Sequence, residues 1–305
     1  MTRTEANIVL FSITLCWASS YIFIKNLPPT LSSFAYMTLT AGVAGIIFIF
    51  VFFNKLRELK GKLLIHSGIM AAIICVSLFF ERLGIANIPA STASFVASLN
   101  IVFVPLLLLL LKRKPTKNNL FGIVLILLGL IPTSGVHLGH SLDPGVLYMV
   151  ASCIFMSAYI IIADNFTKKY DPLLLGIGQM FFIAIIAYVI WYLEDPKTFL
   201  TVTYTNEMLA NIFLLAFFAR AYAYIMLMYS QKYANPISVT VIASTEPVVT
   251  MVLALLIPNT YGVTESFTLM KLIGAGIIVA GAICAGISFL DKPGFLQKPK
   301  FLENK

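Results

Sequence analysis

The chain has 305 residues, of which 59% are hydrophobic and 11% are charged, and its mean hydropathy is +0.93. This composition excludes a soluble globular domain and predicts an integral membrane protein. The formal net charge of +8 does not indicate a nucleic-acid partner, because Lys and Arg fall in short clusters between apolar runs, a pattern that sets membrane topology. The four cysteines lie inside apolar runs, without metal-ligand spacing, and predict no disulfide framework.

Ten apolar segments are long enough to span a bilayer as helices. We expect these spans at residues 6–25, 31–53, 63–84, 90–111, 118–136, 144–164, 172–192, 207–231, 236–257 and 269–290. The first segment is not followed by a small-x-small cleavage pattern, so we expect it to be retained as a spanning helix. The predicted fold class is therefore an all-α membrane protein with ten transmembrane helices.

The positions of Lys and Arg predict the orientation of these helices. One side of the membrane takes the basic clusters at residues 55–62, 112–117 and 168–169 and the basic residues after position 290. The other side takes Lys25, Arg82, Lys197 and Lys271. Because basic loops remain in the cytoplasm, we expect a multi-pass protein of the inner or plasma membrane with both termini in the cytoplasm.

The two halves of the chain share sets of residues in the same order. The pattern Ser-x-Tyr-Ile-x-Ile begins at Ser19 in the first span and again at Ser157 in the sixth, and Asn100 in the fourth span corresponds to Glu246 in the ninth. Five spans per half would place the two copies in opposite orientations, an arrangement found in transporters whose site lies near the membrane midplane. We therefore predict two inverted five-helix repeats, with a basic cytoplasmic tail after them; the boundaries are 1–136, 137–291 and 292–305.

Two charged residues lie deep within predicted helices. Arg220 lies about 13 residues before a turn at residues 233–236, and Glu246 lies about as far after it. With a helical rise of ~1.5 Å per residue, both are ~20 Å from the turn and near the middle of a hydrocarbon layer ~30 Å thick. A charge at that depth costs ~2.5–3.5 kcal/mol unless it faces a partner or a wet cavity. We therefore predict a functional cavity, with a structural ion pair between the two helices as the alternative.

Polar and aromatic residues on other spans are further candidates for this cavity. Asn100, the repeat counterpart of Glu246, either faces the cavity or makes an interhelical hydrogen bond worth ~1 kcal/mol. Aromatic residues either line the cavity and stack on an aromatic or cationic substrate, or pack between helices and at the membrane interface. The predicted substrate-binding residues are Trp17, Tyr21, Phe79, Asn100, Tyr159, Arg220, Tyr224 and Glu246.

Two other groups of polar residues are interpreted as structural. Glu81 and Arg82 lie near the outer end of the third span, where we expect an interfacial ion pair, with a gate as the alternative. His137 and His140 have the spacing of a helical metal site and lie close to Asp143. They belong to a Gly-containing loop without a clear fourth ligand, however, and zinc sites in proteins are usually four-coordinate. No metal and no cofactor are predicted.

These residues resemble an EamA-type member of the drug/metabolite transporter superfamily over nearly the whole chain. The resemblance rests on the glycines of the fifth and tenth spans, on residues 90–100, on Cys16-Trp17-Ala18-Ser19-Ser20-Tyr21 with Lys25, and on Glu246-Pro247-Val248. It implies ten helices in two inverted repeats and alternating access for small metabolites. It also implies a central cavity lined largely by the first, third, fourth, sixth, eighth and ninth helices, on which Trp17, Asn100 and Glu246 lie.

The leading hypothesis is a secondary active transporter of an amino acid or a related amine, working in the export direction. Glu246 would meet the ammonium group of the substrate or exchange a proton with it. Arg220 would neutralise Glu246 or receive a carboxylate, and the aromatic side chains would stack on the apolar part. The expected partners are a small-molecule substrate, the lipid bilayer and a proton as candidate coupling ion, and the protein is a monomer or a homodimer.

Three alternatives are kept. The first is an importer or exchanger of a quaternary amine, a nucleotide-type or another metabolite. The second, more remote, is an integral membrane enzyme acting on a lipid-linked substrate, which needs paired carboxylates, a metal cluster or a nucleophile with a base near one interface. The third is a scaffold without transport activity. The leading hypothesis predicts that the protein is not an enzyme.

Overall fold

The structure consists of apolar helices joined by short connections. The computed structural model describes residues 3–112, 115, 117–133, 143–194, 196–198, 202–258, 262–266 and 268–286. The regular elements among these residues are all helical, and they are α1 (Arg3–Lys25), α2 (Ser33–Phe52), the 3₁₀ helix η1 (Phe53–Glu58), α3 (Lys62–Asn87), α4 (Ala90–Ala97), α5 (Asn100–Leu110), α6 (Lys117–Thr133), α7 (Pro144–Thr167), α8 (Pro172–Glu194), α10 (Asn206–Leu214), the π-helix η2 (Leu215–Tyr222), α11 (Ala223–Gln231), α12 (Pro236–Ala243), α13 (Glu246–Leu256) and α14 (Leu269–Gly286).

Eight helical segments of the described chain are long and apolar enough to span a membrane. Three of them combine consecutive helices: α4 with α5, α10 with η2 and α11, and α12 with α13. Helices α6 and α14 contribute shorter apolar stretches, Lys117–Gly129 and Leu269–Gly281. The predicted all-helical, multi-pass membrane fold is confirmed. The number of ten spans remains a prediction, because the spans expected at 118–136 and 269–290 extend beyond the described residues.

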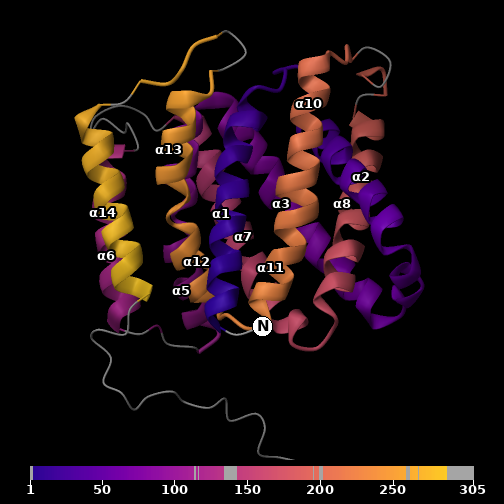
Figure 1. Cartoon of the computed structure of the whole chain (residues 1–305), viewed down its shortest axis with the longest axis horizontal. Helices are drawn as coiled ribbons and strands as arrows, with labels where there is room; N and C mark the ends of the chain where they lie inside the picture. Colours follow the sequence, from indigo (N-terminus) through magenta and orange to yellow (C-terminus); the bar gives the residue numbers. More distant parts are fainter. Residues whose placement is uncertain are drawn as a thin grey trace, which may run out of the picture.

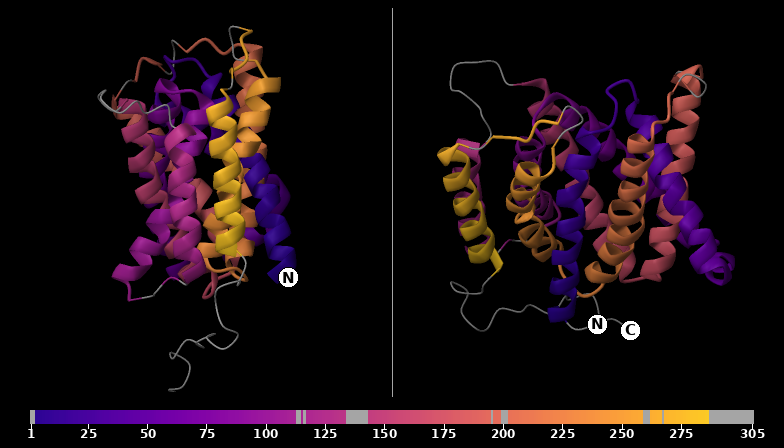
Figure 2. Two further views of the ribbon diagram at one scale, coloured as in Figure 1. Left: turned by 90° about the vertical axis from the view of Figure 1, so that its left-hand side faces the viewer. Right: turned by 45° about the horizontal axis from the view of Figure 1, so that its top comes forward.

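The helices stand side by side, as Figure 1 shows. Helices α6 and α14 pack against each other at one end of the molecule, and α2 packs against α8 at the other. Between these pairs, α3 packs against α7, and α1 packs against α11 and α13. Helix α1 begins on the side of the molecule where α14 ends (Figure 2). The two end pairs therefore flank the central helices.

Large apolar side chains cover the outer surface of the helices. Phe50 of α2 and Leu110 of α5 are 82% and 79% exposed, a degree of exposure that lipid tails accommodate because they are as apolar as leucine. Polar residues are found inside instead, where Arg220 and Glu246 are among the buried residues. This distribution of apolar outside and polar inside is the reverse of a soluble protein and suits a bilayer.

Reciprocal hydrogen bonds tie the ends of α1 and α3 together. The Lys25 ammonium at the end of α1 donates to three carbonyl oxygens at the end of α3, at 3.0–3.1 Å. Arg82 of α3 donates in turn to the carbonyl oxygens of Ile24 and Pro28, at 3.4 and 3.1 Å. The carbonyls of Ile24 and Pro28 also accept the backbone N–H groups of Leu27 and Leu31, at 3.2 and 3.0 Å. Basic side chains near the end of a helix add donors to its last carbonyls. The expected ion pair of Glu81 with Arg82 is therefore wrong, since Arg82 holds α1 instead.

Two spans are tightened near their middle, where a short turn with hydrogen bonds to the third residue back separates two α-helices. The turns lie at residues 98–99, between α4 and α5, and at residues 244–245, between α12 and α13. In each turn a backbone N–H donates to the carbonyl three residues earlier, at 3.0 and 3.1 Å. Pro247 contributes to the second turn because it has no N–H and its ring displaces the carbonyl four residues before it. Asn100 begins α5 and Glu246 begins α13, directly after each turn.

Candidate functional site

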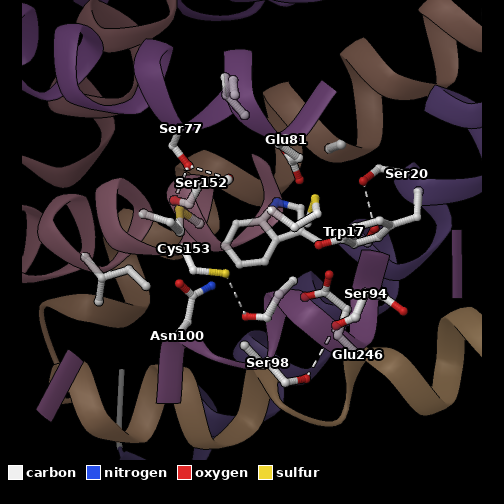
Figure 3. A pocket seen from close by; sticks show the side chains of 18 of the residues that line it. Trp17, Ser20, Ser77, Glu81, Ser94, Ser98, Asn100, Ser152, Cys153 and Glu246 are labelled. Carbon is white, nitrogen blue, oxygen red and sulfur yellow. Dashed lines mark hydrogen bonds between the residues drawn. The ribbon is translucent and has the colours of Figure 1, made fainter. Parts of the chain in front are cut away.

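A cavity of about 60 Å³ lies between the central helices. Helices α1, α2, α3 and α7 line it together with the two tightened spans and the span that contains η2. Figure 3 shows the side chains that extend into it, with Trp17 between Glu81 and Glu246 in this view. The charged residues of this lining are Glu81, Arg220 and Glu246. The cavity thus gathers ionisable groups that the hydrocarbon layer would otherwise exclude.

Arg220 is held by aromatic hydroxyls. It lies on the π-helix η2, a rare geometry that occurs often at functional sites, and it is 3% exposed. Its guanidinium donates to the Tyr36 hydroxyl at 2.5 Å and to the Tyr224 hydroxyl at 3.4 Å. The guanidinium carbon also lies 5.3 and 5.7 Å from the centroids of the same two rings, within cation–π range. Two neutral side chains therefore fix this cation in the wall of the cavity.

Glu246 lies across the cavity on α13 and is 7% exposed. The Tyr21 hydroxyl of α1 is beside its carboxyl group. Thr250 donates to the backbone carbonyls of Glu246 and Ala18, at 3.0 and 3.3 Å, and so ties this part of α13 to α1. The alternative interpretation, a structural ion pair between Glu246 and Arg220, is wrong, because these two side chains form no salt bridge within the described chain.

Asn100 occupies the position in α5 that Glu246 occupies in α13. It lines the cavity, and its side-chain oxygen accepts a hydrogen bond from the Ser157 hydroxyl of α7 at 3.1 Å. Both interpretations of this residue therefore apply at once: it faces the cavity and also joins two helices. Its carboxamide oxygen is therefore held by α7.

Hydroxyl groups form much of the remaining polar wall. The residues concerned are Ser20, Ser94, Ser98, Thr240 and Ser244, and each donates its proton to a carbonyl of its own helix. A hydroxyl has one proton and two lone pairs, so these groups present acceptors to the cavity once the proton is used. The sequence analysis did not single out these residues, although several lie at helical spacing on one face, as Ser94 and Ser98 do.

The structure brings six of the eight predicted residues to this cavity: Trp17, Tyr21, Asn100, Arg220, Tyr224 and Glu246. The ring of Trp17 packs edge-on against that of Tyr224, with centroids 5.9 Å apart. Their role in substrate binding stays a prediction. Phe79 and Tyr159 are placed outside the lining, which corrects their expected position.

Phe79 and Tyr159 have other contacts that explain their placement. Phe79 stacks on Phe34 and packs edge-on against Phe80, with centroid distances of 5.1 and 5.3 Å. Tyr159 is fully buried, and its hydroxyl donates to the Gln179 side chain at 2.9 Å. The Tyr159 ring lies 6.1 Å from that of Tyr224, so it supports the cavity wall from behind.

Glu81 is the charged lining residue that the sequence analysis placed elsewhere. It lies two residues after Phe79 on α3, and its side chain extends into the cavity (Figure 3). The interfacial position expected for it is therefore wrong. Phe79 and Glu81 cannot both face the cavity, because residues two apart on a helix point in directions ~200° apart.

A second cavity of about 330 Å³ lies beyond α1, on the side away from the start of that helix. Ile22, Lys25 and Glu265 line it, whereas Tyr21 and Ile24 line the central cavity. The last turns of α1 therefore form part of the wall between the two spaces. Glu265 belongs to the connection between α13 and α14.

The histidines considered as metal ligands, His137 and His140, lie outside the described residues. Asp143 caps α7, because its carboxylate accepts a hydrogen bond from the Gly145 N–H at 2.7 Å. Within the described ranges, no three His, Cys, Asp or Glu side chains gather as a metal site would require.

Comparisons with known proteins agree on the kind of molecule. The model of the EamA-like transporter family matches residues 4–135 and again residues 143–287. A protein of Archaeoglobus fulgidus described as an uncharacterized transporter is 23% identical over 289 residues, covering 93% of this chain and 87% of that protein. A solved crystal structure of another chain is 18% identical, has a TM-score of 0.67, and is matched over 93% of this chain and 97% of that chain.

Proposed function

This chain belongs to the EamA-like transporter family and is a membrane transporter, and from that premise we propose that it moves an amino acid or a related amine through the central cavity. The transport is secondary active, by alternating access, in the export direction, with a proton as the coupling ion. The observation that carries this proposal is a nearly buried carboxylate, Glu246, at the tight turn of a span that lines the cavity. Broken helices at the membrane midplane are where transporters of this kind place their sites.

The proposed architecture has ten spans in two inverted repeats, with α6 and α14 as the fifth and tenth spans. The pattern of helix contacts supports this arrangement. Helix α3 packs against α7 as α11 packs against α1, and α2 packs against η2 as α8 packs against α3. Exchanging the two halves therefore reproduces the same contacts, as a two-fold axis would. We assign residues 1–136 and 137–291 to the two repeats and residues 292–305 to a cytoplasmic tail.

The proposed orientation places both termini in the cytoplasm. The connections after α2, α5 and α7 carry the basic clusters at residues 55–62, 112–117 and 168–169. In alternating spans these connections fall on the side where α1 begins, and α14 ends on that side as well (Figure 2). Basic connections remain in the cytoplasm, which supports this orientation.

In the proposed mechanism, the Glu246 carboxylate binds the substrate's ammonium group or, in the other half of the cycle, a proton. Trp17 and Tyr224 form an aromatic wall beside it, suited to the apolar part of the substrate or to its charge. Arg220 is fixed by two tyrosines and provides the positive end of the site, where a substrate carboxylate would lie. The inverted repeat would then expose the cavity to one side of the membrane at a time.

The test is transport in proteoliposomes after the substitution Glu246→Gln. We expect uptake of radiolabelled amino acids and amines by the wild-type protein, driven by an outwardly or inwardly directed pH gradient, and loss of this uptake in the variant. The matched control is Glu207→Gln, which removes an exposed acid from the start of α10. Uptake by Glu246→Gln at the wild-type rate across the pH range would falsify the role assigned to this carboxylate.

A further inference from the structure

The described lining of the central cavity contains more carboxylates than cations. Glu81 and Glu246 are the acidic residues, and Arg220 is the basic residue. With all three ionised, the lining carries a net charge of −1. Two further basic residues nearby, Lys25 and Arg82, lie outside this lining and donate to backbone carbonyls at the ends of α1 and α3.

The lining has one cation for its two acids. Two tyrosines hold the guanidinium of Arg220 in place on η2, and Glu81 and Glu246 both extend into the same cavity. Two like charges in a poorly solvated space repel each other, and a positive ligand between them relieves that repulsion.

The hydrogen bonds of the lining point to the same ligand. The hydroxyls of Ser20, Ser94, Ser98, Thr240 and Ser244 use their protons on backbone carbonyls. Ala243 is a lining residue, and Pro247 leaves its carbonyl without the helical donor, because proline has no backbone N–H. The cavity therefore presents lone pairs from hydroxyls and carbonyls besides its two carboxylates. An ammonium group, which has three donors and no acceptor, is the complement of such a wall.

We propose that this cavity selects ligands with a net charge of +1, namely primary amines and amino acids with a basic side chain, over neutral zwitterions, and that Glu81 determines this selection. The inference rests on the proposed transport function and names the substrate class within it. Glu81 and Glu246 lie on opposite sides of Trp17 in Figure 3. In a basic amino acid the two ammonium groups would meet the two carboxylates, and the carboxylate would lie toward Arg220.

The experiment compares ligands of similar length that differ in charge. Purified full-length protein in detergent is titrated with pentylamine, lysine, norleucine and glutarate while its thermal unfolding is followed. We expect pentylamine and lysine to stabilise the wild-type protein at concentrations at least about tenfold lower than norleucine. A unit charge about 10 Å away, at an effective dielectric near 20, changes the affinity of an ion by roughly this factor. Glutarate should have no effect.

The variant Glu81→Gln keeps the shape of the side chain and removes its charge. We expect the preference for lysine over norleucine to shrink to within about threefold, whereas the control Glu207→Gln keeps the full preference.

Equal affinity for lysine and norleucine in the wild-type protein overturns the inference, and so does an unchanged preference in Glu81→Gln. In both cases uptake of amino acids would leave the proposed function standing. If none of the ligands binds or is taken up, the proposed function fails and the inference fails with it. Should Glu81→Gln not fold, the ligand order of the wild-type protein still decides.

Discussion

The spans α4–α5 and α12–α13 follow the same backbone course and carry different chemistry. Each tightens for two residues and then begins a second helix with a polar residue that lines the central cavity. In the first span this residue is Asn100, which is neutral and held by Ser157 of α7. In the second it is Glu246, which is ionisable and lies on the side of α1. The shared backbone therefore supplies the position, and only the second span places an ionisable side chain there.

The starts of the same two spans differ in how they are capped. Helix α12 follows Asn235, whose side chain accepts a hydrogen bond from the Ser238 N–H at 2.8 Å. Helix α4 follows Pro89, which has no side-chain acceptor. Glu265 of the α13–α14 connection caps it instead, accepting from the Ala90 N–H at 2.8 Å and from the Ser91 N–H and hydroxyl. The residue directly before α12 therefore caps that helix, whereas the start of α4 is capped by a residue distant in sequence.

Exchanging Asn100 and Glu246 tests the largest difference between the two spans. We expect Glu246→Asn to reduce uptake at least about 30-fold, because truncating one partner of a buried charge contact costs ~2–5 kcal/mol. The double variant Asn100→Glu with Glu246→Asn keeps the number of carboxylates and moves one to α5, beside α7. We expect no rescue, since Tyr21 and α1 are not its neighbours there. Rescue to within tenfold of the wild-type uptake would show that the two halves are equivalent.

Removing the two caps tests the second difference and has a smaller effect. Glu265→Gln weakens a charged cap that receives three donors, and we expect it to lower the free energy of unfolding by ~1–2 kcal/mol, allowing for the partial exposure of this side chain. Asn235→Ala removes one neutral cap and should cost ~1 kcal/mol. Equilibrium unfolding in mixed micelles measures both. A larger loss for Asn235→Ala would contradict the greater dependence of α4 on its distant cap.

The same pair of variants also reports on access to the cavity. Ala97 of α4 lines the central cavity, and Ala97→Cys can be introduced into a chain whose four cysteines are replaced by alanine. Because Glu265 holds the α13–α14 connection against α4, we expect Glu265→Gln to increase labelling of this cysteine by a membrane-impermeant maleimide added on the side where α4 begins. Asn235→Ala should leave the labelling rate unchanged.

The sequence predicted the position of the charged residues along their spans better than the rotation of the spans. The rise of a helix is fixed, so counting residues from a turn was enough to predict that Arg220 and Glu246 would line one cavity. Their depth in the bilayer stays a prediction. The residue count did not predict which face of α3 lines the cavity. Phe79 was expected there and Glu81 was not, although the two point in nearly opposite directions on one helix. Only the packing of α3 between its neighbours decides this rotation, because the polar residues of α3 are not gathered on one face and do not indicate which side is buried.

The local geometry of the tightened spans could be predicted in one half only. Pro247 predicts a kink beside Glu246, because proline removes a helical hydrogen bond. The corresponding turn at residues 98–99 has no proline next to it, since Pro105 lies inside α5. Likewise, the π-helix that carries Arg220 has no sequence signal comparable to a proline. The pairing of Glu265 with α4 joins residues about 175 positions apart, so a pattern of local residues does not reveal it.

The smallest expected effects separate the roles of two hydroxyls that hold the central residues. Ser157→Ala removes the bond to Asn100, and Thr250→Val removes the bonds to the backbone carbonyls of Glu246 and Ala18. Interhelical hydrogen bonds in membranes contribute ~0.6 kcal/mol on average, so each variant should lose about that much free energy of unfolding.

The effects of Ser157→Ala and Thr250→Val on uptake should differ. We expect near-normal uptake for Ser157→Ala, because Asn100 carries no charge, and a loss of several-fold for Thr250→Val, because the backbone that positions Glu246 is no longer held against α1. Equal losses of uptake in the two variants would mean that the position of Asn100 matters as much as that of Glu246, and the functional difference between the two halves would then have to lie outside these spans.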